Sequence, residues 1–134
     1  WGDLDYLIVD MSPGTSDAAL TIMQTLPLDG FVIVTGPQEL AALDARRSVN
    51  MVKKLNMSIL GVVENFSGEI FGSGAGEEIA REMDLPFMGR LELREDYRHT
   101  SRPTVLNSKA VMSEYRSIAE QAKLALQRVA ASAT

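Results

Sequence analysis

Short apolar segments alternate with segments of helical periodicity along almost the whole of this 134-residue chain. The expected strands are residues 6–10, 31–35, 58–64 and 86–91, and the expected helices are residues 17–26, 39–55, 77–83 and 110–129. Parallel strands need helical crossovers of this kind, whereas antiparallel strands are joined by short turns. The order therefore predicts an α/β fold, with a partial parallel sheet as the middle of three layers.

The burial expected of these elements follows from their apolar residues. Strands 6–10 and 31–35 are continuous apolar runs, which is typical of strands buried on both faces. Helix 17–26 is expected to begin with Asp17 as its N-cap. In helix 39–55 the expected buried stripe consists of Leu40, Leu43, Val49, Val52 and Leu55.

The first apolar run ends on Asp10, and a Pro13-Gly14 turn follows it. Because α/β proteins bind ligands at the carboxyl ends of parallel strands, Asp10 is expected at the ligand-binding edge. One carboxylate suits Mg²⁺, which keeps most of its waters, and Gly14 can adopt a positive φ that brings its N–H near a phosphate. The pattern D-x-x-P-G-T-x-D over residues 10–17 thus predicts half of a nucleotide triphosphate site. The alternative is a surface turn in which Asp10 caps local backbone donors.

The other half of such a site, a G-x-x-x-x-G-K-[ST] loop, occurs nowhere in the chain. Residues 72–76 are glycine-rich, but they follow a loop, lack a lysine and lead into Glu77 and Glu78, which repel phosphate. We interpret residues 68–76 as a flexible connector. The chain is then the second half of a nucleotide-binding domain, and Trp1 in place of an initiating Met favours a truncated start.

Composition excludes several classes of protein. The chain is 46% hydrophobic and 23% charged, which predicts one soluble domain, and its net charge of -5 argues against a nucleic-acid surface. No apolar stretch is long enough to span a membrane. The absence of cysteine removes disulfides, thiolate catalysis and cysteine-ligated clusters from this chain, and we expect a cytoplasmic protein. The single histidine, His99, is interpreted as a solvated side chain.

Several segments match one family in order and spacing. Residues 4–17 resemble the second nucleotide motif of the Mrp/ApbC ATPases, relatives of the septum-site regulator MinD. Residues 34–47 resemble the strand–helix junction that comes next in that family, and residues 60–67 (Leu-Gly-Val-Val-Glu-Asn-Phe-Ser) resemble its GxVENMS segment. Residues 70–72 and 86–90 complete the series. The chain thus resembles the C-terminal portion, residues 1–134, of a single MinD-type P-loop ATPase domain.

The resemblance implies that the intact protein binds and hydrolyses ATP with Mg²⁺, forms a homodimer around the nucleotide, and delivers an iron–sulfur cluster to a client apoprotein. Asp10 would be the catalytic Walker B carboxylate, which acts on the metal through water. Asn65 would contact adenine, and Pro37 also belongs to the nucleotide site. The γ-phosphate switch would include Pro13, Gly14, Thr15 and Asp17. This chain alone lacks the phosphate-loop lysine and is expected to be inactive.

Three departures from the family pattern bear on these expectations. Ser12 replaces the first proline of Pro-Pro-Gly, and Glu92 replaces a proline on the base side of the site. Cluster-bearing members also have a C-x-x-C motif where only two residues separate Ser67 from Ile70 here. An iron–sulfur cluster held by that motif is therefore not expected within this chain.

The family's sheet order predicts a gap in this chain's sheet. In that family the Walker B strand lies beside the phosphate-loop strand. Strand 31–35 would lie on the far side of the phosphate-loop strand, which this chain lacks. Open edges of this kind need further chain or association to cover them. The alternative function is a MinD- or ParA-like ATPase in cell division or chromosome partitioning. The weakly basic, Ala-rich end argues against membrane binding, and the acidic balance argues against DNA binding.

Overall fold

The computed structural model describes residues 2–98 and 101–133, so that His99 lies outside the described part of the chain. In chain order the elements are α1 (Asp17–Thr25), β1 (Phe31–Thr35), α2 (Glu39–Lys54), β2 (Ile59–Ser67), α3 (Ala75–Glu82), β3 (Phe87–Glu92), the 3₁₀ turn η1 (Glu95–Arg98), α4 (Thr104–Asn107) and α5 (Lys109–Ser132).

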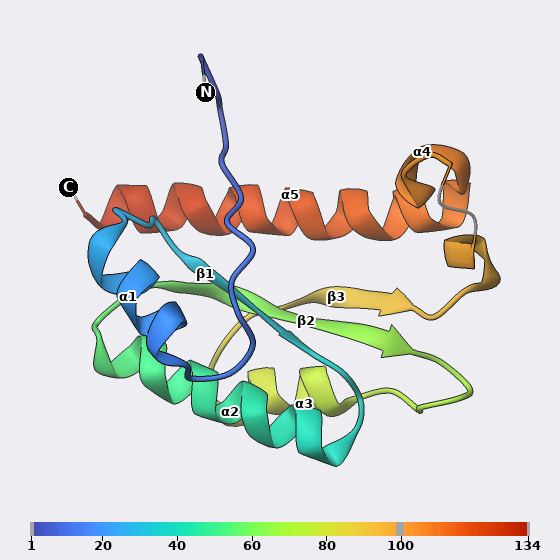
Figure 1. Cartoon of the computed structure of the whole chain (residues 1–134), viewed down its shortest axis with the longest axis horizontal. Coiled ribbons are helices and arrows are strands. Elements are labelled where there is room, and N and C mark those ends of the chain that lie inside the picture. The colour runs from blue at the N-terminus through green and yellow to red at the C-terminus, as the bar shows by residue number, and fades with distance from the viewer. Residues whose placement is uncertain (1, 99–100, 134) are drawn as a thin grey trace.

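The three strands form one parallel sheet in the order β1-β2-β3. Helices α2 and α3 pack on one face, and α5 packs on the other face against β3 and β2 (Figure 1). This arrangement confirms the predicted α/β fold with a partial parallel sheet in the middle of three layers. Because the strands are parallel, their carboxyl ends lie along one edge, at Thr35, Ser67 and Glu92.

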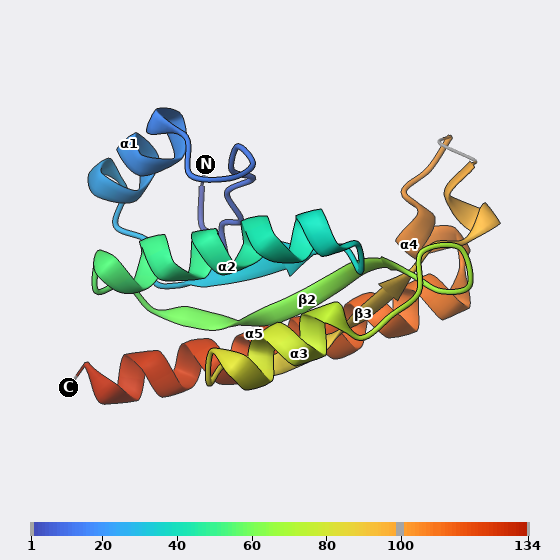
Figure 2. The ribbon, with the colours of Figure 1, turned by 90° about the horizontal axis from the view of Figure 1, so that it is seen from below.

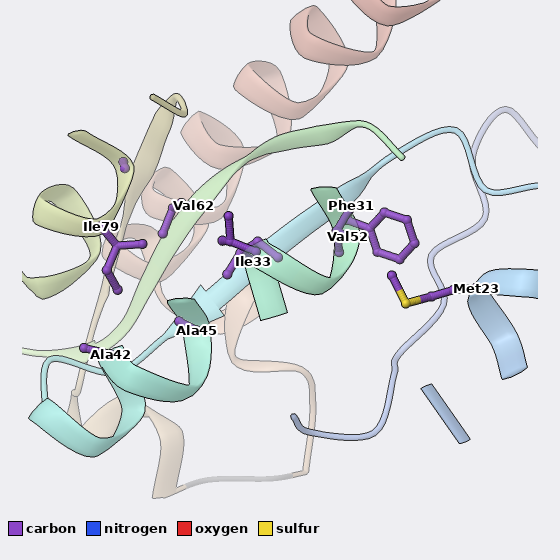
Figure 3. Close-up of a cluster of buried hydrophobic side chains, with 10 residues drawn as sticks. Met23, Phe31, Ile33, Ala42, Ala45, Val52, Val62 and Ile79 are labelled. Carbon is purple, nitrogen blue, oxygen red and sulfur yellow. The ribbon is translucent and has the colours of Figure 1, made fainter. Parts of the chain in front are cut away.

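Two apolar clusters fill the spaces between the layers. The larger one joins α2 and α3 to the sheet, and Figure 3 shows Ile33 and Val62 directed toward these helices. Its buried members are Met23, Phe31, Ile33, Ala42, Ala45, Val49, Val52, Val62, Ile79 and Ala80. The smaller cluster lies under α5. It combines Leu60, Val63, Met88 and Leu91 with the helix residues Ile118, Ala122, Ala125, Leu126 and Val129.

The buried stripe of α2 differs from the predicted one. Leu40 is 71% exposed and Leu43 is also exposed, whereas the buried residues are Ala42, Ala45, Val49 and Val52. Those four follow helical spacing, and the alanines allow α2 to approach the sheet closely. The sequence pattern favoured the larger side chains, which lie off that stripe.

The predicted strand 6–10 is absent. Residues 2–12 form no strand, and Ile8 is 92% exposed (Figures 1 and 2). A strand forms only beside a partner that takes up its backbone hydrogen bonds, and residues 6–10 have no such partner within residues 2–98 and 101–133. The prediction of a strand at residues 6–10 is therefore wrong for the described structure, which supplies no neighbouring strand for it.

Strand β1 is buried on one face only. Phe31, Ile33 and Thr35 are buried, whereas Val32 and Val34, which point to the opposite face, are exposed. The prediction of burial on both faces was therefore wrong for this strand. One edge of β1 pairs with β2, and its other edge has no partner strand in the described part of the chain.

The N-cap of helix α1 is not the predicted residue. The Ser16 hydroxyl accepts a hydrogen bond from the Ala19 N–H at 3.2 Å, which makes Ser16 the N-cap in place of the predicted Asp17.

In the described ranges, no helix combines the length and apolar character needed to cross a membrane.

Candidate functional site

The carboxyl ends of β1 and β2 lie side by side and place two of the predicted site residues at one edge. The strand register sets Thr35 opposite Glu64, so Pro37 follows β1 where Asn65 approaches the end of β2. The Thr35 hydroxyl is buried and donates to the Gly36 carbonyl at 3.0 Å, which fixes the turn. Pro37 and Asn65 are half-buried and remain accessible at this edge.

Asn65 has unused hydrogen-bonding capacity. Its Oδ1 atom accepts a hydrogen bond from the Phe66 N–H at 2.9 Å. Its Nδ2 atom donates to no other group in residues 2–98 and 101–133. A side-chain amide carries two donors and an acceptor with two lone pairs, so Asn65 can still pair with the edge of a base.

The Asp10–Asp17 segment is mostly exposed and leads into α1. Asp10 makes no hydrogen bond or ion pair with another described residue, and Pro13 and Thr15 are exposed in a turn. Gly14 has φ +72°, as the sequence predicted. The Asp17 carbonyl accepts the Thr21 hydroxyl at 2.8 Å. Among the described residues, no hydrogen bond or ion pair links this segment to Pro37 or Asn65, so the structure leaves the two parts of the predicted site unconnected.

Sequence reasoning missed Glu64, which is fully buried beside the site. Its Oε2 atom accepts backbone N–H bonds from Gly74 at 2.9 Å and from Gly76 at 2.8 Å, and its Oε1 atom lies 3.1 Å from the Gly74 nitrogen. A buried carboxylate requires such donors, and the start of α3 supplies them together with its positive dipole end. The signal in the sequence was a lone acidic residue within an apolar run, followed by a glycine cluster.

Arg90 completes the charge arrangement around Glu64. Its Nε lies 3.8 Å from Glu64 Oε1, and its Nη2 donates to Glu77 Oε2 at 3.0 Å. The guanidinium also lies over the Phe87 ring, 5.4 Å from its centroid. Arg90 is partly exposed, so it screens the buried carboxylate from the solvent side without enclosing it.

The glycine-rich segment is anchored, contrary to the prediction of a flexible connector. Gly68 and Gly72 exchange two backbone hydrogen bonds, at 2.9 and 2.7 Å, which closes a small loop. Gly74 has φ +113°, a conformation that favours glycine, and its N–H is bound by Glu64. The glycines therefore serve to form tight turns around one carboxylate.

An open hollow of about 830 Å³ lies between the β1–α2 turn and α3. Pro37 lines it, but Asn65 does not. Glu77, Glu78 and Arg81 also line it, and the two carboxylates outnumber the one guanidinium, which disfavours a phosphate there. Within residues 2–98 and 101–133, no three His, Asp or Glu side chains gather in a way that could hold a metal ion.

Beyond β3, charged and phenolic groups hold the chain against α5. Arg94 Nη2 lies 2.6 Å from both Glu92 Oε2 and Glu114 Oε1, and the Glu114 contact raises the pKa of Arg94. Burial raises the pKa of the Tyr97 hydroxyl to about 12, with further contributions from Tyr115 and Glu114. These contacts fix the segment that follows the carboxyl end of β3.

Comparison with known proteins adds a family match that covers nearly the whole chain. A family model described as ParA: NUBPL iron-transfer P-loop NTPase matches residues 1–129. The iron–sulfur cluster carrier protein of Methanocaldococcus jannaschii is 42% identical over 135 residues, which cover 90% of this chain and 47% of that protein. The carrier of Saccharolobus solfataricus is 47% identical over 104 residues, covering 69% of this chain and 35% of that protein. The chain spans about half the length of the curated relatives it matches, or less.

Two solved structures share the fold. The cell division ATPase MinD of Pyrococcus furiosus superimposes with a TM-score of 0.74 at 21% identity, over 89% of this chain and 52% of MinD, a likeness that concerns the fold alone. A nucleotide-binding protein of Archaeoglobus fulgidus, solved in complex with ADP, superimposes with a TM-score of 0.62 at 29% identity. That match covers 94% of this chain and 47% of the A. fulgidus chain.

Proposed function

Because the chain belongs to the NUBPL iron-transfer family of ParA-type P-loop NTPases, we propose that residues 1–134 form the C-terminal portion of a single ATPase domain. The intact protein, meaning the longer protein that contains this chain, binds ATP with Mg²⁺. The observation that carries the proposal is that Pro37 and Asn65 lie at the same edge of the sheet, where the Asn65 amide donors are unengaged within residues 2–98 and 101–133. The A. fulgidus relative, solved with ADP, supports nucleotide as the ligand.

The residues of this chain fit the parts of such a site that they would hold. Asn65 and Pro37 would lie on the base side. Asp10 would hold the metal through water, and its carboxylate is exposed and free of protein partners in the described ranges. The γ-phosphate side would be formed by Pro13, Gly14, Thr15 and Asp17. The bound Mg²⁺–nucleotide supplies the phosphoanhydride bond and the charge that these groups orient.

The free edge of β1 supports the proposed domain organisation. Val32 and Val34 are uncovered on the face where α5 packs over β2 and β3, and residues 6–10 have no strand partner among the described residues. One further strand between residues 6–10 and β1, with its helix over Val32 and Val34, satisfies both features. The phosphate loop that this chain lacks would belong to that strand–helix unit.

Cluster delivery requires groups from outside this chain. The curated relatives are named iron–sulfur cluster carriers, but this chain contains no cysteine. Any cluster would need ligands elsewhere in the intact protein, a homodimer partner or the client apoprotein. A MinD- or ParA-like positioning role receives support only from the fold of MinD, since the identity is 21%.

Phosphate release from ATP by the intact protein tests the proposal. We expect Mg²⁺-dependent release, which Asp10→Asn reduces at least about tenfold because the metal-side carboxylate is lost. Asp5→Asn is the matched control, since Asp5 is also an exposed aspartate of the same segment. Wild-type turnover in Asp10→Asn would contradict the assignment of Asp10, and turnover by residues 1–134 alone would contradict the proposed division of the site.

A further inference from the structure

Two consecutive side chains of β2 hold opposite ends of the same loop. Asn65 Oδ1 accepts the N–H of Phe66 at 2.9 Å, in the bulge that precedes Ser67, the last residue of β2. The Glu64 carboxylate accepts the N–H groups of Gly74 and Gly76, where the chain enters α3. Neighbouring side chains of a strand point to opposite faces, so these two residues clamp residues 66–74 from both sides of the sheet.

Both ends of this loop are tightly constrained. Phe66 has φ +60°, which is a strained conformation for a bulky residue and persists only when its surroundings enforce it. The Gly68–Gly72 bridge closes the middle of the loop. At the far end, a Cβ atom on Gly76 would lie 2.9 Å from the Glu64 Cβ atom, so the backbone has no room to shift toward the strand.

The loop presents apolar side chains to solvent instead of burying them. Ile70 is 76% exposed, and Phe66 and Phe71 are about half exposed. Since the loop adds little to the core, its order depends on its anchors, which are the Phe66–Asn65 bond, the pairing of Ser67 with β3, the Gly68–Gly72 bridge and the bonds of Glu64. A change at either end is therefore felt along residues 66–74.

We propose that Glu64 is a positioning residue that couples occupancy of Asn65 by a nucleotide base to the order of residues 66–74. The inference rests on the proposed function, because it takes Asn65 as the base contact. A base that pairs with the Asn65 amide fixes the acceptor of the Phe66 N–H bond and tightens the first end of the loop. Glu64 fixes the second end of the loop at the start of α3. Because that end does not move, the constraint at Phe66 lowers the mobility of residues 66–74.

Linkage makes this coupling reciprocal. If the bound base orders the loop, then a loop that is already ordered by Glu64 binds the base more tightly, by the same factor. Weakening the Glu64 clamp must therefore lower nucleotide affinity, although Glu64 faces away from Asn65. A residue with a purely structural role in α3 has no such effect.

Hydrogen exchange of the intact protein, with and without ADP and Mg²⁺, tests the coupling directly. In the wild-type protein, we expect ADP to slow exchange of the amides in residues 66–76 by about fivefold or more. Calorimetric titration of ADP on the same sample reports binding separately. Absence of ADP binding would contradict the proposed function, whereas binding without protection of residues 66–76 would contradict only the coupling.

Two substitutions resolve the role of the carboxylate. Glu64→Gln removes the charge and places an amide against two N–H donors, so exchange at Gly74 and Gly76 should rise about tenfold and ADP affinity should fall about threefold or more. Glu64→Asp keeps the charge on a shorter side chain and should restore part of both properties.

The matched control is Glu77→Gln. Glu77 is an exposed carboxylate in the first turn of α3, and its bond goes to Arg90 instead of the loop. We expect wild-type ADP affinity and loop protection in this variant. A Glu64→Gln protein with wild-type affinity and ADP-dependent protection would overturn the proposal. If that variant does not fold, Glu64→Asp decides the matter: wild-type ADP affinity and wild-type exchange at Gly74 and Gly76 in that variant would overturn the role of Glu64.

Discussion

The backbone of Gly76 lies directly against Glu64. The Gly76 N–H donates to Glu64 Oε2 at 2.8 Å, and a side chain at position 76 would meet the Glu64 Cβ atom at 2.9 Å. The absence of a side chain at position 76 allows α3 to approach β2. This approach brings the Gly76 N–H to the buried Glu64 carboxylate, whose charge needs a donor.

Gly76→Ala is therefore expected to destabilise the protein. Alanine favours helices over glycine by up to about 1 kcal/mol, but the added methyl group must displace α3 from β2 and costs about 1–3 kcal/mol by overpacking. The second effect wins, because the contact is to strand backbone and Cβ atoms. Urea unfolding of the intact protein measures the difference. Ser73→Ala, an exposed change in the same segment, should leave stability unchanged.

Asn65→Asp should weaken ADP binding about tenfold while leaving the fold intact. The carboxylate keeps an acceptor for the Phe66 N–H but loses both amide donors and repels acceptor atoms of a base. Calorimetry with ADP and Mg²⁺ measures this loss in the intact protein. Asn56→Asp introduces the same charge at an exposed turn and should bind ADP normally. Equal affinities in the two variants would remove Asn65 from the base site.

Tyr97 should ionise late in an alkaline titration. Burial raises its pKa from 10.0 to about 12, so the folded state favours the neutral phenol. This contribution to stability is complete below pH 10 and is lost as the pH rises toward 12. Tyrosinate absorbance of the folded protein should show a component near pH 12 that Tyr97→Phe removes. A titration unchanged by that substitution would contradict the assignment.

Residues 1–134 expressed alone should associate through the open side of β1. The strand has a free edge, and Val34, 59% exposed, lies on its uncovered face. We expect sedimentation and melting to depend on protein concentration, and Val34→Lys to weaken the association. Leu40→Lys, an exposed apolar residue on α2, is the control. A cooperative melt independent of concentration would argue that the chain is stable without a partner.

The sequence predicted elements best where local pattern and neighbours agree. Phe31–Thr35 is an apolar β-branched run bounded by Gly30 and Gly36, and the strand has those limits in the structure. Helix 39–55 was predicted to within one residue of its end. Residues 6–10 carry an equally strong strand pattern and form none, because a strand needs a partner that no local pattern supplies.

The positions of the candidate residues were predicted only in part for a similar reason. Asn65 lies two residues before the end of β2 and Pro37 two residues after the end of β1, and parallel pairing brings both to one edge of the sheet, whereas their role in a site stays a prediction. Glu64 was overlooked because its partners are backbone N–H groups about ten residues away, and the glycine cluster that supplies them was interpreted as a connector. The same is true of Leu40 and Leu43, whose exposure depends on how α2 rotates against the sheet.

The strand order also bears on how this region acquires its structure during synthesis. Each strand pairs with the one that precedes it in the chain, and every crossover helix packs beside the strands it connects. One crossover helix joins each pair of neighbouring strands, so the loop entropy of pairing is close to the smallest that parallel strands allow. The sheet can therefore grow strand by strand as the chain emerges from the ribosome, and α5 can cover the second face only after β3 has been added.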